Sequence, residues 1–152
     1  RIVYHYFPTK EALFERLTQS MDDLVTVPEG GRPVMAHSPA ELADALPSQY
    51  RFLDANRKTF LALTVSEFGD QVAEQRRESR AERTDAALEP LSANLDDEEM
   101  RRLRGIVGLL SSFDGFHALT TAWGLTTEEA ADAAAWAVLT LCNRARRSGV
   151  AT

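Results

Sequence analysis

At 152 residues, with 44% hydrophobic side chains, the chain can bury enough surface to fold without disulfide or metal staples. Its single cysteine, Cys142, excludes an internal disulfide, and no apolar stretch approaches the roughly 18 residues that a membrane span needs, so we expect a soluble cytoplasmic protein. The formal net charge of −6 is uneven, because residues 1–10 contain Arg1 and Lys10 and no acid, whereas residues 11–152 contain 15 basic and 23 acidic side chains.

Apolar side chains recur at spacings of three and four residues along almost the whole chain, which predicts an all-α fold. A first helix is expected to end before Pro8, and Thr9 is expected to cap the next one. Two prolines and two glycines between residues 28 and 33 mark the strongest linker in the sequence. We place this linker at residues 26–37.

The body after the linker begins with a capping signal. Ser38-Pro-Ala-Glu41 predicts a helix start, and the helix should bury one face and end at Asn56. The members of that face are Leu42, Leu46, Tyr50 and Leu53. A short helix around Phe60 should close at Gly69, and residues 71–91 should form a solvated helix with an ion pair between Glu74 and Arg77.

Two further capping signals divide the remaining residues. Asp96 with Glu99 should begin a helix that runs to Gly124, and Thr126 with Glu129 should begin the last one. The last helix is apolar nearly all round from Ala130 and ends in arginines, whose charge suits a helix carboxyl end.

The most informative stretch lies at the start of the chain, where residues 1–14 read RIVYHYFPTKEALF. This stretch resembles the end of the helix-turn-helix of TetR-family regulators, whose recognition helix finishes in Tyr-x-Tyr/His-Phe, followed by a lysine-containing turn and Glu-x-Leu. The matching residues are Tyr4, Tyr6, Phe7, Pro8, Thr9, Lys10, Glu11 and Leu13. The alternative interpretation is an aromatic core patch with incidental polar tips.

The resemblance implies a TetR-like fold with two parts joined by the linker. Residues 1–25 would be the end of the recognition helix and the connecting helix of an incomplete DNA-binding headpiece, and residues 38–152 a ligand-binding and dimerisation domain. Tyrosine hydroxyls and a lysine at helix ends suit phosphate oxygens. The expected DNA contacts are Arg1, Tyr4, His5, Tyr6 and Lys10. Since the earlier headpiece helices are not in this sequence, we expect no operator binding by the chain alone.

The resemblance also implies a small-molecule inducer bound inside the body. The body contains an aromatic set with two polar anchors, which suits a small lipophilic or aromatic effector. The expected ligand-binding residues are Phe52, Phe60, Phe68, Phe113, Asp114, Phe116 and His117. For each phenylalanine the alternative is ordinary core packing, and for His117 it is a hydrogen-bonded interior or interface histidine.

A homodimer is expected through the last two helices. Gly105, Gly108 and Gly115 weaken a helix, and close approach of another backbone would compensate for that cost. The expected interface residues are Gly115, Leu119, Trp123, Trp136 and Leu139. The alternative is a final helix that is buried within its own monomer.

The sequence therefore predicts a homodimeric, ligand-responsive DNA-binding repressor that effector binding releases from operator DNA. One alternative is a helical dimerising small-molecule-binding module without DNA-binding function. The second is a small helical enzyme, whose turnover would depend on His117 or Asp114. We expect no enzyme, no cofactor and no metal, since the three histidines are far apart and neither a HExxH, a P-loop nor a GxGxxG motif occurs.

Overall fold

The computed structural model describes residues 9, 12, 35–64 and 69–148, and every regular element in these ranges is helical. The elements are α3 (Pro39–Ala55), α4 (Arg57–Thr64), α5 (Gly69–Leu88), the 3₁₀-helix η1 (Glu89–Asn94), α6 (Asp97–Leu110), α7 (Phe113–His117), the π-helix η2 (Ala118–Ala122) and α8 (Thr127–Ser148). The predicted all-α class is confirmed for these residues. The helix-turn-helix residues of the proposed headpiece lie outside them, apart from Thr9 and Ala12.

Local capping signals set the starts of α3, α6 and α8 as predicted. The Oγ of Ser38 accepts a hydrogen bond from the Glu41 N–H at 3.2 Å, although the Glu41 carboxylate takes the N–H of His37 rather than that of Ser38. Asp96 and Thr126 each begin a full capping box. In both, the capping side chain accepts from the backbone N–H three residues later, and the glutamate at that position accepts from the backbone N–H of the capping residue. Thr9 also caps, because its Oγ1 accepts from the N–H of Ala12 at 3.1 Å.

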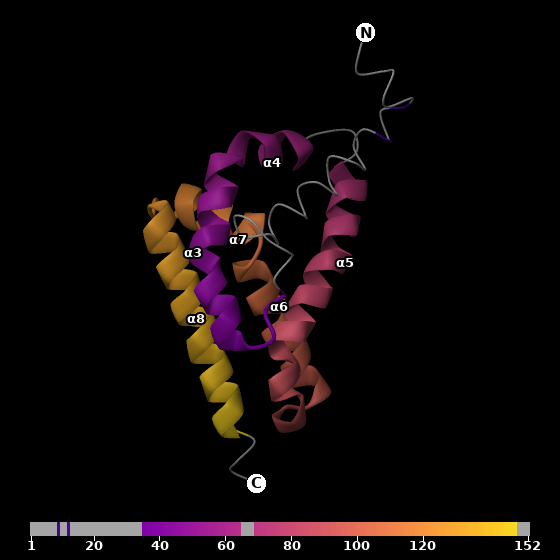
Figure 1. Cartoon of the computed structure of the whole chain (residues 1–152), viewed down its shortest axis with the longest axis vertical. Coiled ribbons are helices and arrows are strands. Elements are labelled where there is room, and N and C mark those ends of the chain that lie inside the picture. Colours follow the sequence, from indigo (N-terminus) through magenta and orange to yellow (C-terminus); the bar gives the residue numbers. More distant parts are fainter. Residues whose placement is uncertain (1–8, 10–11, 13–34, 65–68, 149–152) are drawn as a thin grey trace.

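The core lies between two antiparallel helices, α3 and α8, which Figure 1 shows side by side and which make the most extensive contact in the described part. The predicted face of α3 is buried as expected. The opposing stripe of α8 is built from small side chains, which let the two helices approach closely. Its members are Ala130, Ala131, Ala134, Val138 and Cys142. The third side of the core is covered by α5 and α6 (Figure 1).

The prediction of one helix from Asp96 to Gly124 is wrong, because the chain turns after α6. Two α3 side chains satisfy the free carbonyls at the end of α6. The Tyr50 hydroxyl donates to the Leu110 carbonyl at 2.6 Å, and Gln49 Nε2 donates to that of Ser111 at 2.7 Å. Ser112 then caps α7 by accepting from the Gly115 N–H at 3.1 Å. The break turns α7 toward the end of α3 (Figure 1).

Two other boundaries differ from the prediction. Gly69 is the first residue of α5 rather than the end of the short helix, and α5 ends at Leu88. The chain then tightens into η1, which has Pro90 in its first turn and buries Leu91. The predicted pair between Glu74 and Arg77 is present at 2.8 Å.

Candidate functional site

Aromatic rings from α3, α4 and α7 form one cluster at the end of the bundle where α3 meets α4. Phe60 and Phe113 stack with centroids 4.9 Å apart, and Phe113 stacks in turn on the His117 imidazole at 5.6 Å, with interplanar angles of 14° and 15°. Phe52 meets the edge of Phe60 at 6.3 Å, and Phe116 meets Tyr50 at 5.2 Å. Within the cluster, Phe60, Phe113 and His117 therefore form a column of near-parallel rings that ends in an imidazole.

Most of the predicted ligand-binding residues are members of this cluster. Phe60, Phe113 and Phe116 are buried and belong to the hydrophobic core, whereas Phe52 and His117 are half-buried at its edge. Asp114 is exposed in the first turn of α7, where a carboxylate favours the helix start. Phe68 lies outside the described residues. Of the predicted residues in the cluster, only Phe52 and His117 are therefore partly accessible.

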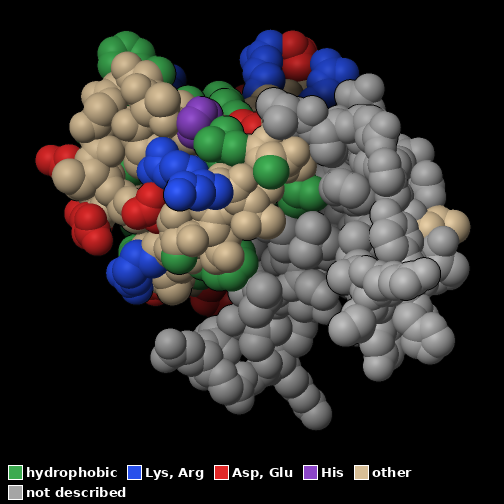
Figure 2. Space-filling view, turned by 90° about the horizontal axis from the view of Figure 1, so that it is seen from above, with side chains coloured by type: hydrophobic (Ala, Val, Ile, Leu, Met, Phe, Trp, Pro, Cys, Tyr) green, Lys and Arg blue, Asp and Glu red, His purple; other side chains and the backbone are tan. Residues whose placement is uncertain are grey.

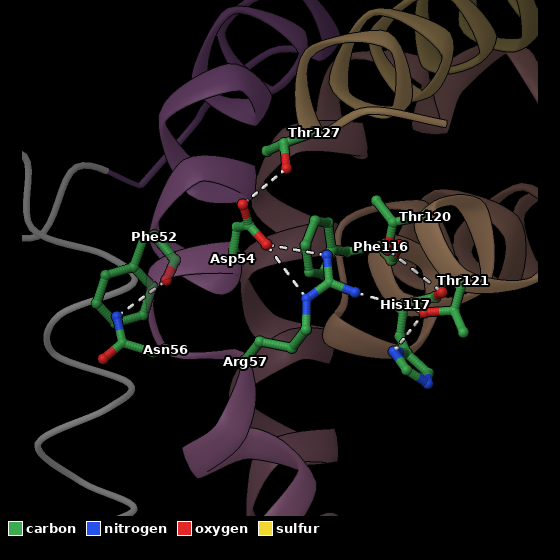
Figure 3. A network of polar contacts seen from close by, with 9 residues as sticks. All are labelled: Phe52, Asp54, Asn56, Arg57, Phe116, His117, Thr120, Thr121 and Thr127. Carbon is green, nitrogen blue, oxygen red and sulfur yellow. Dashed lines mark hydrogen bonds and ion pairs between the residues drawn. The ribbon is translucent and has the colours of Figure 1, made fainter. Parts of the chain in front are cut away.

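A polar network covers the outer side of the cluster, and Figure 3 shows its members. The Arg57 guanidinium lies over the Phe116 ring, 4.7 Å from its centroid. Its Nε and Nη2 donate to Asp54 Oδ1 at 3.2 and 2.9 Å, and its Nη1 donates to Thr121 Oγ1 at 3.4 Å. The same Thr121 oxygen lies 3.2 Å from His117 Nδ1. Arg57 thus joins α4 to the π-helix η2.

Asp54 connects the same network to a third helix. Its Oδ2 accepts a hydrogen bond from the Thr127 hydroxyl at 2.9 Å, which ties the end of α3 to the start of α8. The hydrogen bonds from Arg57 and Thr127 hold the pKa of the Asp54 carboxyl below its ordinary value. The carboxylate therefore stays charged to a lower pH than that of a free aspartate, and its hydrogen bonds orient Arg57.

The sequence prediction missed Arg57, Asp54, Thr121 and Thr127. The contacts of Arg57 with Thr121 and of Asp54 with Thr127 join residues 64 and 73 positions apart, which periodicity does not relate. The Asp54–Arg57 pair is local, three positions apart, and the prediction did not use it. Figure 2 looks onto this end of the bundle and shows basic and acidic side chains beside a histidine and apolar side chains on the described surface. The site is therefore a mixed aromatic and charged surface over a buried aromatic floor.

Large apolar side chains are exposed at several positions of the last helices. Trp123 is 78% exposed after η2, and Trp136 is 70% exposed on α8, on the side opposite its buried stripe. Leu139 is exposed on the same helix, and Ile106 and Leu109 are exposed on α6. The alternative of a final helix buried within the monomer accounts for one face of α8 only.

The other two predicted interface residues pack within the chain. Leu119 is half-buried against the core. Gly115 is buried, and a Cβ there would lie 2.3 Å from the Leu109 carbonyl oxygen. The close backbone approach that a glycine permits at residue 115 is thus made inside the monomer. Trp123, Trp136 and Leu139 remain as the outward-facing members of the predicted interface.

The expected DNA contacts at Arg1, Tyr4, His5, Tyr6 and Lys10 lie outside the described residues. Among the described residues no three His, Cys, Asp or Glu side chains gather so that they could hold a metal ion. In the same ranges no helix combines the length and apolar character needed to cross a membrane. Comparisons with known protein families, with curated proteins and with solved structures gave no match to this chain.

Proposed function

We propose that the chain is the sensing and dimerising part of a TetR-type repressor, in which a small effector bound by the body releases operator DNA. The observation that carries the proposal is the Tyr4–Leu13 motif. The cap that Thr9 forms on Ala12 supports it, since the motif requires a helix to begin after its turn. The all-α body and the aromatic cluster near its surface are consistent with a sensing domain.

The exposed tryptophans support a symmetric dimer. Each can bury about 150–250 Å² of mostly apolar surface, and an isologous contact would bury both copies of each. We expect sedimentation equilibrium to give a dimer at micromolar concentration and Trp136→Ser to weaken it. Leu61→Ser, which removes an exposed apolar side chain from α4, is the control and should leave the mass unchanged. A wild-type monomer at micromolar concentration would contradict the interface.

In the dimer, two headpieces would read half-sites about 34–36 Å apart or a multiple of that spacing. Effector binding would change the distance between the headpieces, so effector and DNA would weaken each other's binding by the same factor. Tyr4 and Lys10 would contact phosphates, which fix the position of the headpiece on the duplex without reading the sequence.

The test is selection of duplexes from a random pool by the protein that the complete gene encodes. We expect enrichment of a two-fold symmetric site. Lys10→Ala should weaken binding to all sequences alike. It should also reduce by about one the slope of the logarithm of the binding constant against the logarithm of the salt concentration. Failure to enrich any duplex, with dimerisation intact, would replace the proposal by a dimerising small-molecule-binding module without DNA-binding function.

A further inference from the structure

Arg57 has hydrogen-bonding capacity that its protein partners do not use. A guanidinium carries five N–H donors, and within the described part of the chain Arg57 makes three hydrogen bonds, one of them long at 3.4 Å. Its side chain is 29% exposed, so part of it is accessible to a ligand. Asp54 and the Phe116 ring also hold it in one orientation, which lowers the entropy that a new hydrogen bond would cost.

The groups beside Arg57 suit a flat ligand. The Thr121 hydroxyl is in contact with both Arg57 and His117. His117 is the half-buried outer end of the ring column, and its imidazole is nearly parallel to Phe113. One more planar ring placed against the imidazole would continue the column, and such offset stacking is favourable beyond the area that it buries.

Charge narrows the class of ligand further. A carboxylate matches the planar donor edge of a guanidinium and carries a single negative charge. The Asp54 carboxylate beside Arg57 disfavours a second negative charge, as on hydrogen phosphate, at the same place. A neutral ligand would leave the remaining donors of Arg57 without a charged partner.

We infer that this end of the bundle binds a small aromatic carboxylate. The carboxylate accepts hydrogen bonds from Arg57 and Thr121, and the ring lies against His117. The inference deepens the proposed function by naming the class of effector, and it rests on that function only for the statement that the ligand controls DNA binding.

The test compares benzoate with benzamide, which has the same ring and shape but no charge, in ligand-observed NMR titrations of the full chain. We expect benzoate to bind and benzamide to bind at least about tenfold more weakly, as the loss of a charge-assisted hydrogen bond implies. Inorganic phosphate has no ring to stack on His117, and it should also bind at least about tenfold more weakly. Equal binding of benzoate and benzamide, or no binding of benzoate at millimolar concentration, would overturn the inference.

Variants locate the site. Arg57→Gln should weaken benzoate binding about tenfold or more, and Arg51→Gln is the matched control, because Arg51 is exposed on the neighbouring turn of α3 and its loss changes the net charge equally. Arg57→Lys keeps the charge and the fold if Arg57→Gln proves unstable, and it should weaken binding less. Asp54→Asn should tighten binding, because it removes the competing charge while the amide oxygen can still accept a hydrogen bond from Arg57 and orient it. Equal losses in the two Gln variants would mean non-specific attraction and would contradict the site.

These measurements separate the inference from the proposed function, because they need no DNA. Benzoate binding that depends on Arg57, together with no selection of DNA by the complete protein, would leave the site in place and refute the repressor. Selection of DNA by the complete protein without benzoate binding would support the repressor and refute the aromatic carboxylate site.

Discussion

Gly115 is the position where one added methyl group tests the turn between α6 and α7. An ideal Cβ at residue 115 would lie 2.3 Å from the carbonyl oxygen of Leu109 and 3.0 Å from its carbonyl carbon. These are backbone atoms, so relief requires a shift of the end of α6, whose carbonyls Tyr50 and Gln49 hold in place. Overpacking of a core costs about 1–3 kcal/mol, and we expect Gly115→Ala to lower the free energy of unfolding by about 3 kcal/mol.

Helix propensity alone predicts the opposite sign, since alanine in a helix is about 0.5–1 kcal/mol more stable than glycine. Gly105 provides the matched control, because a Cβ there meets nothing within 4 Å, and Gly105→Ala should raise the free energy of unfolding by about that amount. Urea unfolding followed by far-ultraviolet circular dichroism at several protein concentrations separates folding from association. A Gly115→Ala variant as stable as the wild type would refute the geometry of the turn.

Three further predictions concern single side chains. Tyr50→Phe removes the hydrogen bond to Leu110 and should lower the free energy of unfolding in urea by about 1–3 kcal/mol, because it leaves that carbonyl unpaired. Burial raises the pKa of the Cys142 thiol from 9.0 to about 11, so iodoacetamide should modify it slowly in the folded protein and fast in urea, and stability should fall as the pH rises above about 9. The hydrogen bond from Arg57 holds the pKa of Asp54 below its ordinary value of 3.8. The stability that the Asp54 carboxylate contributes is therefore present above that pH and is lost as the pH falls below it. Asp54→Asn should flatten this acidic part of a plot of unfolding midpoint against pH.

Helix starts could be predicted from sequence because capping is local. The hydrogen bonds of Ser38, Asp96 and Thr126 join residues three positions apart, so the signal lies within one turn. The buried face of α3 could be predicted for the same reason, since its spacing repeats along one helix. The break after α6 could not, because apolar spacing continues through it and the side chains that stabilise it belong to α3.

The candidate site was predictable in its rings and not in its charges. Phe113, Phe116 and His117 stand close together in the sequence and point to one patch of a helix. The spacing of Asp54 and Arg57 indicates only an ion pair within one helical turn. Nothing local connects Arg57 to Phe116 and Thr121, which come from a distant part of the chain. The serine pair at residues 111 and 112, before Asp114, was the one local sign of a new helix start.

Both tryptophans of this chain lie at the surface, which decides what its intrinsic fluorescence can report. Emission from the folded monomer should be close to that of hydrated indole, and unfolding of the monomer should shift its maximum little. A blue shift or protection from acrylamide quenching would instead mark the moment at which something covers Trp123 or Trp136. The tryptophan emission of this chain therefore reports its contacts with other molecules, a second copy of itself included, rather than the folding of the monomer.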